Sequence, residues 1–310
     1  FNLLARSSLV DNVALPLVYA KDQKDLRIKI AKNILERMGL GQYFESKPNQ
    51  TFIFIDGSYF NFYRYFSLMN WWRIAYPEEP MEDPFKNEKF VEKFRKTFVE
   101  NVQQIPKKLG LNKLELEPII IVGKDCKREN IWRTELFPKY KANRANGVED
   151  GFMGGPFFKM AYEEELFVKG GAKAILKHGK LEADDCIAIS VKLLTAKYPD
   201  CSIYIITSDK DYLQLNSHNV HLFNLAFKNI AENKSSTGDA KIDLEIKIIM
   251  GDTSDNIPSA FPKCGPKTAQ KCIEDPEFFK KKMAGNPDYF KQYELNKKLL
   301  NRSKSENLKL

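Results

Sequence analysis

The stretch Leu181-Glu182-Ala183-Asp184-Asp185 places three carboxylates within four residues, directly before the run Cys186-Ile-Ala-Ile-Ser-Val-Lys-Leu-Leu194. The largely apolar run predicts a buried helix, and the acids lie where that helix begins. A helix N-terminus favours Asp and Glu through its partial positive charge, which explains one or two acids more easily than three. Carboxylates this close repel one another and stay ionised only where a cation lies among them. Taken alone, the stretch fits helix capping and a cation site equally well.

The composition is that of a folded, basic protein. The chain has 310 residues, of which 43% are hydrophobic, enough for a substantial core. Its net charge of +8 suggests a polyanionic partner. No apolar run approaches the roughly 18 residues that span a bilayer, and no signal peptide is evident. The five cysteines form no CxxC pair, which predicts free thiols in a reducing compartment and no zinc site. We therefore expect a cytoplasmic protein that is neither secreted nor membrane-bound.

Strand and helix patterns alternate along most of the chain. Helical patterns occupy residues 59–66 and 86–110, and the chain is helical in pattern from about residue 259 onward. Residues 147–155 are glycine-rich and predict a mobile loop. The alternation predicts an α/β fold with a largely parallel central sheet flanked by helices. Short apolar runs predict its strands at residues 51–56, 117–122, 172–176, 202–207 and 219–223.

Residues 1–50 differ from the rest and are interpreted as a separate, non-catalytic N-terminal extension. Leu26, Ile30, Ile34 and Met38 recur every four residues and predict an amphipathic helix that Gly39 ends. The segment resembles part of an ABC transporter ATPase of the lipoprotein-release and macrolide-export class. No GxxxxGK[ST] loop occurs in the chain, so this resemblance implies no nucleotide site. The matching pieces are Phe1-Asn-Leu-Leu-Ala-Arg6, Asp11-Asn-Val-Ala-Leu-Pro-Leu17 and Ile34-Leu-Glu-Arg-Met-Gly-Leu40.

Further acids follow the predicted strands or lie at helix and loop transitions. Sites in open α/β sheets form at the carboxyl ends of the strands, so these acids are expected to converge. Carboxylate oxygens without His or Cys favour Mg²⁺ or Mn²⁺, and two such ions can hydrolyse a phosphodiester. An acidic centre in a basic protein therefore predicts a metal-dependent nuclease. The nine candidates are Asp56, Asp125, Glu182, Asp184, Asp185, Asp209, Asp211, Asp252 and Asp255.

From Thr51 onward the chain resembles the flap endonuclease-type 5′ nucleases, closest to phage and viral members. The resemblance implies a PIN-like 5′ nuclease fold. It also implies a first metal on Asp56, Asp125, Glu182 and Asp184, and a second near Asp185, Asp209, Asp211, Asp252 and Asp255. The shared pieces are Ile55-Asp56-Gly57-Ser58, Gly123-Lys124-Asp125, Trp132-Arg133, Phe137-Pro-Lys-Tyr-Lys-Ala-Asn-Arg144, Leu181-Glu-Ala-Asp-Asp185, Thr207-Ser-Asp-Lys-Asp211 and Gly251-Asp-Thr-Ser-Asp-Asn256.

The resemblance also implies contacts with nucleic acid. Lys141 and Arg144 would grip the scissile phosphate, where negative charge develops during attack. Lys139 fits a solvated basic face as well as a phosphate contact, and Arg133 is a further candidate DNA contact. Residues 130–178 would form a helical arch for a 5′ single strand. Phe62 would stack on a base, although core packing explains it equally well.

Residues 259–269 resemble the helical hairpin with which this family grips duplex DNA. Cys264 replaces the first glycine of its pattern, and would be strained if that position required a positive φ. A hairpin of this kind aims backbone amides at phosphates. The DNA-binding candidates here are Lys263, Gly265, Lys267 and Thr268.

The sequence thus predicts an extension (1–50), a catalytic domain (51–250) and a helical duplex-binding region (251–310). The expected function is a structure-specific 5′ nuclease that uses two Mg²⁺ ions, replaceable by Mn²⁺, on 5′ flaps or RNA primers. Its partners would be DNA, or an RNA–DNA hybrid, and replication proteins. The chain would be a monomer that acts in the cytoplasm or at a viral replication site in a host. A PIN-type ribonuclease acting on single-stranded RNA and a catalytically silent DNA-binding protein are the alternatives.

Overall fold

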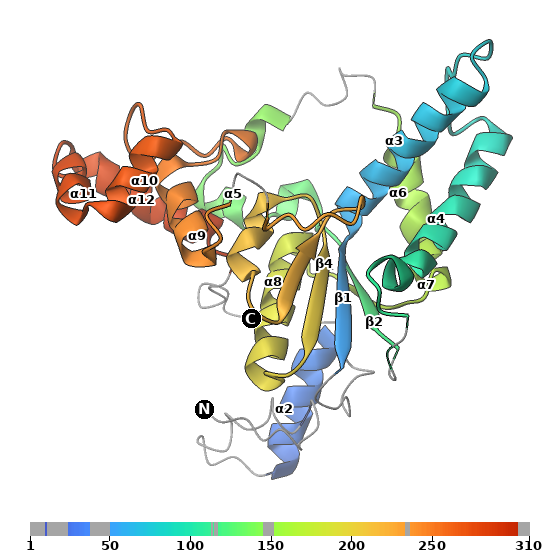
Figure 1. The fold of residues 1–310 in the computed structure, drawn as a ribbon, viewed down its shortest axis with the longest axis horizontal. Coiled ribbons are helices and arrows are strands. Elements are labelled where there is room, and N and C mark those ends of the chain that lie inside the picture. The colour runs from blue at the N-terminus through green and yellow to red at the C-terminus, as the bar shows by residue number, and fades with distance from the viewer. Residues whose placement is uncertain are drawn as a thin grey trace.

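A computed structural model describes residues 10, 24–37, 50–112, 114, 117–144, 152–232 and 236–302. Its centre is a five-stranded, fully parallel sheet in the order β3-β2-β1-β4-β5, which confirms the predicted fold class (Figure 1). The strands are β1 (Thr51–Asp56), β2 (Ile119–Gly123), β3 (Ala172–Leu176), β4 (Ser202–Ile206) and β5 (Val220–Phe223).

The strand order reverses direction at β1. The chain proceeds from β1 to β2 and β3 on one side, then crosses to β4 and β5 on the other. Such a reversal opens a crevice at the carboxyl ends of the strands, between β1 and β4. In Figure 1 these ends point upward, toward the start of α3 (Gly57–Ala75).

Helices cover both faces of the sheet, and residues of β1 alternate between two apolar clusters. Phe52 and Phe54 pack with α8 (Ala183–Lys197) on one face. Ile53 and Ile55 pack on the other face with helices that include the aromatic-rich α3. Burial on both faces explains why β1 and β2 are largely continuous apolar runs rather than alternating ones. The helices of the second face are α3, α4 (Glu88–Lys108), α6 (Gly155–Glu163) and α7 (Leu166–Lys169).

A helical lobe with its own core completes the chain. It lies to the left of the sheet in Figure 1, whereas α3 and α4 lie to the right. Ile248, Ala269 and Leu299 belong to one buried cluster that joins its helices. The predicted boundary at residue 251 therefore moves upstream, because α9 packs into this lobe. The lobe consists of α9 (Ala240–Met250), α10 (Pro266–Glu274), α11 (Pro276–Met283) and α12 (Pro287–Leu300).

The N-terminal segment is not a separate piece where the structure describes it. Helix α2 (Lys24–Arg37) confirms the predicted amphipathic helix, whose proposed end at Gly39 lies outside the described residues. Ala31 and Leu35 are buried in the same cluster as α8 and the strands β1 and β4. The apolar stripe of α2 therefore contributes to the core of the catalytic domain.

The predicted arch at residues 130–178 is too wide. Phe157 and Phe167 are fully buried in the core, and residues 172–176 form a strand of the sheet. Within the described residues, the short elements η3 (Arg128–Asn130), α5 (Arg133–Leu136) and η4 (Ala142–Arg144) precede this core segment. Residues 147–151 of the predicted mobile loop lie outside the described residues. Among the described helices, none has the length and apolar character that crossing a membrane requires.

Candidate active site

The ends of β1 and β2 bring the first two acids together. Asp56 ends β1 and caps α3, accepting a hydrogen bond from the Tyr59 N–H at 3.0 Å. A Cβ on Gly57 would lie 2.5 Å from the Gly123 carbonyl oxygen, so only glycine lets the chain turn here against β2. Asp125 accepts hydrogen bonds from the Ser58 hydroxyl at 2.5 Å and the Ala183 N–H at 2.7 Å. Asp125 thus joins the ends of both strands to the start of α8.

The acids at the start of α8 serve the helix and the site at once. Glu182 and Asp185 form a capping box, each side chain binding the backbone of the other. The capping role expected of one or two acids is therefore real. Asp184 lies between them, with one oxygen accepting from the Asp185 N–H at 2.7 Å. All three acids are buried, which solvated caps are not.

Seven of the nine predicted acids form three overlapping groups, in each of which carboxylate oxygens lie within 4.8 Å of one another. Asp184 and Asp211 each belong to two groups, so the seven form one continuous cluster. Burial raises the pKa of Asp56 to about 7, and the charges of Asp125 and Asp209 add to the effect. Asp125 adjoins the same cluster through its hydrogen bond from the Ala183 N–H, and Asp56 through the Thr207 hydroxyl, which also accepts from the Asp209 N–H. The groups are Glu182–Asp184–Asp185, Asp184–Asp209–Asp211 and Asp211–Asp252–Asp255.

Arg133 supplies the cation that acids beside a buried helix require, so the prediction that it contacts DNA is wrong. Its side chain is fully buried and reaches Asp185 at 2.5 and 2.6 Å and Glu182 at 2.9 Å. Burial alone would raise the pKa of Asp185, but the Arg133 guanidinium lowers it to about 2. The neighbouring Trp132 indole donates a further hydrogen bond to Asp185 at 3.0 Å. Arg133 is thus committed to the acids and has no surface left for a nucleic acid.

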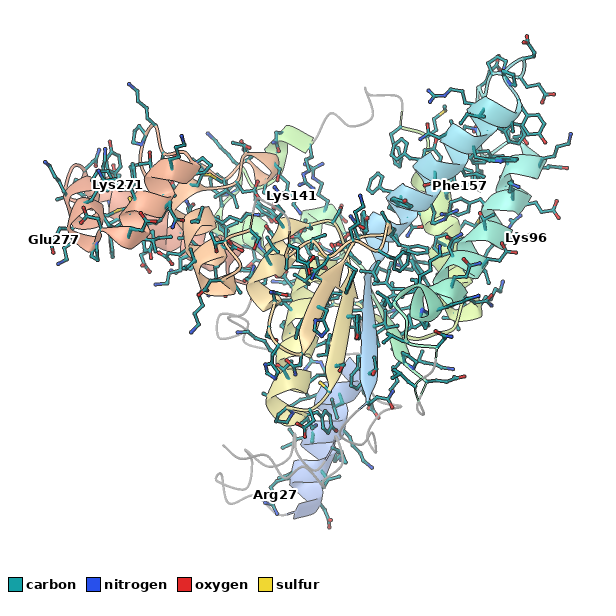
Figure 2. The ribbon with its side chains drawn as sticks, viewed as in Figure 1. Arg27, Lys96, Lys141, Phe157, Lys271 and Glu277 are labelled. Carbon is teal, nitrogen blue, oxygen red and sulfur yellow. The ribbon has the colours of Figure 1, made fainter. Side chains whose placement is uncertain are left out.

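Lys141 and Arg144 lie at the solvent side of the cluster. The Lys141 ammonium is 2.5 Å from Glu182, and the Arg144 guanidinium is 2.7 Å from Asp255. The side chain of Lys141 is 17% exposed and that of Arg144 is 51% exposed. The Lys141 backbone has a left-handed φ of 54° and donates to the Asp255 carbonyl at 2.9 Å. Figure 2 shows Lys141 above the carboxyl edge of the sheet, between the helical lobe and α3.

Two further cations enter the cluster that no sequence pattern indicated. The Arg302 guanidinium is 2.6 Å from Asp211 and 2.9 Å from Asp184. The Lys247 ammonium pairs with Asp211 and lies 2.8 Å from Asp252. Arg302 follows α12, 91 residues from Asp211, so only the packing of the helical lobe brings it here. Lys247 lies on α9, shortly before the predicted motif Gly251-Asp252. This closeness in sequence is the only signal that could have indicated its place in the cluster.

A cleft of about 760 Å³ connects the acidic cluster to the predicted hairpin. Lys139, Lys263 and Lys267 are exposed, as DNA contacts require, and Gly265 is the residue before α10. The condition for strain at Cys264 is not met, because the left-handed residue is Lys263, with a φ of 57°. The cleft residues include Arg144, Asp209, Asp211, Asp252, Asp255, Cys264, Gly265 and Pro266.

Phe62 combines the two environments considered for it. It is 42% exposed, yet its ring lies 4.7 Å from Phe158 and 5.1 Å from Phe152, measured between ring centroids. Phe152 and Phe158 come from the segment predicted to form the arch, and Met153 of that segment is 38% exposed. Phe157 is a core residue instead. A base could therefore stack on Phe62 only at the edge of an existing aromatic group.

A parallel sheet with a carboxylate cluster at its switch point, beside a basic helical lobe, defines an α/β protein of the 5′ nuclease class. Residues 51–244 match the family described as 5′-3′ exonuclease, N-terminal resolvase-like domain. This match covers more than half of the chain, so the protein belongs to that family, as the sequence predicted.

Relatives and solved structures agree with this assignment. A 5′-3′ exonuclease of Buchnera aphidicola is 28% identical over 232 residues, covering 73% of this chain and 70% of its own. DNA polymerase I of Lactococcus lactis is 31% identical over 156 residues, and the match spans only 16% of the polymerase. The crystal structure of the T5 D15 protein with metal ions has a TM-score of 0.54 at 19% identity, covering 82% of this chain and 88% of its own.

The resemblance predicted for residues 1–50 is also confirmed. Fifty residues of the chain are 44% identical to the macrolide export ATP-binding/permease protein MacB of Aggregatibacter actinomycetemcomitans. They cover 16% of this chain and 8% of that protein. A fragment this short carries no argument about transport.

Proposed function

We propose that the protein is a divalent-metal-dependent, structure-specific 5′ nuclease. It would cut phosphodiester bonds near the 5′ ends of DNA flaps or RNA primers during replication or repair. The observation that carries the proposal is the convergence of nine acids from separate segments on the carboxyl edge of one parallel sheet. A catalytically silent DNA-binding protein would have no use for so costly a cluster of buried charge.

The acids fit a hard divalent cation, and we propose Mg²⁺, for which Mn²⁺ can substitute. All the donors are carboxylate oxygens, and Asp184, Asp209 and Asp211 come within 4.8 Å of one another. Asp56, Asp125, Asp184 and Asp209 would hold the ion. Asp209 takes the place expected for Glu182, whose oxygens are engaged by Arg133, Tyr140 and Lys141. When bound, such ions lower the pKa of a water and stabilise the leaving oxygen of a phosphodiester. The count of two ions stays a prediction, because Lys247 and Arg302 lie among the acids of the second.

The chain's own cations would position the substrate. Lys141 and Arg144 lie at the solvent edge of the acids, where an entering phosphate would meet them. Held by Glu182 and Asp255, they are pre-organised to stabilise charge on the phosphoryl oxygens as it develops. Lys139, Lys263, Lys267 and the N-terminus of α10 would bind the duplex phosphates, and Phe62 would contact a base.

The solved T5 D15 flap endonuclease structure with DNA and metal ions supports DNA as the substrate class. We extend this to 5′ flaps and 5′ ends, with RNA–DNA hybrids and replication proteins as further partners of a monomeric chain. The lobe beyond residue 240 favours a duplex partner over the single-stranded RNA of the PIN-type alternative.

One assay tests the proposal. The full chain is incubated with an end-labelled 5′-flap duplex and with a single-stranded RNA of the flap sequence, each with Mg²⁺, with Mn²⁺ or with EDTA. Cutting near the flap junction in either metal, and none in EDTA, is expected. Preferential cutting of the RNA would favour the ribonuclease, and tight flap binding without any cutting would favour a silent binding protein. Sedimentation of the free protein tests the monomer.

A further inference from the structure

The acids of the Asp211–Asp252–Asp255 group are already occupied by other residues of the chain. One oxygen of Asp211 pairs with the Lys247 ammonium and the other lies 2.6 Å from the Arg302 guanidinium. One oxygen of Asp252 is 2.8 Å from Lys247, and the other accepts from the Ser254 N–H and hydroxyl at 2.8 and 2.6 Å. A bound ion would have to replace these partners.

Asp255 is occupied in the same way. Its first oxygen lies 2.7 Å from the Arg144 guanidinium, and its second accepts from the Tyr140 hydroxyl at 3.0 Å. All six oxygens of this group are thus engaged. The group has the composition of a metal site but its charge is already balanced by Lys247, Arg302 and Arg144.

The acids on the β1 side are different. Among the residues that the structure describes, Asp56, Asp125 and Asp209 have neutral hydrogen-bond donors and no ion pair. Their partners are backbone N–H groups and the hydroxyls of Ser58 and Thr207. Uncompensated charge in the site therefore collects at the switch point, where a divalent cation gains the most.

Arg302 is held in its position by burial and by hydrogen bonds of its own backbone and of its neighbours. Its side chain is 2% exposed, and its backbone N–H donates to the Gln214 side chain at 2.9 Å. Gln214 donates in turn to the Leu300 carbonyl at 3.2 Å, and Arg133 donates to the Leu299 carbonyl at 2.8 Å. The end of α12 is thereby tied to the site from two sides. A cation buried this completely is stable only while its carboxylates remain.

We propose that Lys247 and Arg302 hold the position of the second ion in the substrate-free protein, which therefore binds one divalent ion tightly, on the side of the site where Asp56, Asp125, Asp184 and Asp209 lie. The inference rests on the proposed function. A second ion would face two fixed positive charges bound to the same Asp211, and repulsion from them lowers its affinity. The negative phosphate of a bound substrate would offset that repulsion, so second-ion binding would be coupled to DNA binding.

The test is a titration with Mn²⁺ in the absence of nucleic acid. The electron paramagnetic resonance signal of the free ion gives the number of ions that the protein binds. The full chain is expected to bind one Mn²⁺ tightly. Lys247→Met should bind two, with the affinity for the second raised about tenfold or more. Lys241→Met is the matched control, because Lys241 is an exposed residue of the same helix, and it should bind one.

Two tight Mn²⁺ ions in the parent protein, or a single ion in Lys247→Met, would overturn the inference while leaving the nuclease proposal standing. No tight Mn²⁺ in any variant would remove the proposed function as well. If Arg302→Met folds, the number of Mn²⁺ ions that it binds tests the inference a second time. Its thermal midpoint should also rise more with added Mn²⁺ than that of the parent. An equal rise in both proteins would count against the inference.

Discussion

Asp184 and Asp185 are neighbours in the sequence, yet the pKa values of their side chains shift in opposite directions. Burial raises the pKa of Asp184 to about 8, with Arg302 opposing the shift and Asp185 and Glu182 adding to it. Burial also acts on Asp185, but Arg133 lowers its pKa to about 2. Asp185 is thus a structural anion whose pKa its cation lowers, whereas the pKa of Asp184 stays raised although Arg302 lies 2.9 Å away. This difference makes Asp184 the better candidate for a metal ligand.

The pair gives a matched test at pH 7. A raised pKa means that ionisation of Asp184 costs stability at this pH, so Asp184→Asn should keep or raise the metal-free thermal midpoint and abolish cutting. A lowered pKa means that the Asp185 charge stabilises the fold, so Asp185→Asn should lower the midpoint. Thermal unfolding in EDTA and flap cleavage in saturating Mg²⁺ measure the two effects. Parental cleavage by Asp184→Asn would contradict its assignment as a ligand.

Arg133 allows a second test at this scale. Arg133→Met leaves Asp185 and Glu182 buried without their main cation, and breaking such a pair costs about 3–5 kcal/mol of unfolding free energy. Urea unfolding of the variant measures this loss. Lys127→Met, which removes a surface cation six residues away, should change stability by about 0.5 kcal/mol or less. Flap affinity of the folded Arg133→Met protein should match the parent, and a specific loss would restore a DNA-contact role.

At the scale of single elements, helix α2 belongs to the core of the nuclease domain although its sequence resembles an unrelated protein, a transporter ATPase. Leu35 is 1% exposed and packs in the cluster of α8, whereas its neighbour Ile34 is 40% exposed. An apolar pocket of about 260 Å³ lies where α2 meets α8, and Ile34 and Cys186 contribute to its lining. The periodicity of the sequence predicts the amphipathic helix. It does not show which part of the protein the apolar stripe of that helix will pack against.

Leu35→Ala and Ile34→Ala should therefore differ in stability although both lie on α2. The buried residue should cost about 2–5 kcal/mol, and the half-exposed one much less. Removal of residues 1–49 should lower the thermal midpoint and leave the cleavage rate of the folded fraction unchanged, because none of the nine acids lies there. Chemical unfolding and single-turnover cleavage check both statements. A truncated protein that folds but cannot cut would show that the segment serves the site.

The element that carries Lys141 and Arg144 is held by the helical lobe. Lys141→Ala and Arg144→Ala should each slow single-turnover cleavage by about 10²–10³, the usual cost of losing one transition-state donor. Flap affinity should change far less, because duplex binding is assigned to Lys263 and Lys267. Rates at saturating enzyme and affinities in Ca²⁺ separate the two. Equal losses in rate and affinity would indicate a general basic face.

For the whole molecule, the sequence was informative wherever one segment carried the signal. The parallel sheet followed from the apolar runs, and the convergence of the acids from their places after strands and at helix and loop transitions, because the carboxyl ends of parallel strands meet at one edge. Residues whose roles depend on packing between distant segments were not predicted correctly. The sequence indicates neither the role of Arg133 nor that of Arg302, since neither residue lies near its partners in the sequence. The predicted arch is too wide because the sequence does not distinguish a buried aromatic such as Phe157 from an exposed one.

The arrangement of the lobes predicts where salt should act. The helical lobe and the α3–α4 pair lie on opposite sides of the sheet, with Lys271 on one and Lys96 on the other (Figure 2). If the hairpin binds the duplex, each lost phosphate contact lowers the slope of log affinity against log salt by about 0.9. The double variant Lys263→Ala, Lys267→Ala should thus weaken flap binding at every sequence and reduce the slope by about 2.

The cleavage rate of the double variant at saturating protein and its Mg²⁺ requirement should match those of the parent, because neither lysine touches the acids. Lys96→Ala removes an exposed charge from the α3–α4 side and should change neither affinity nor slope. An unchanged slope in the double variant, or an equal change in Lys96→Ala, would place the duplex elsewhere on the molecule.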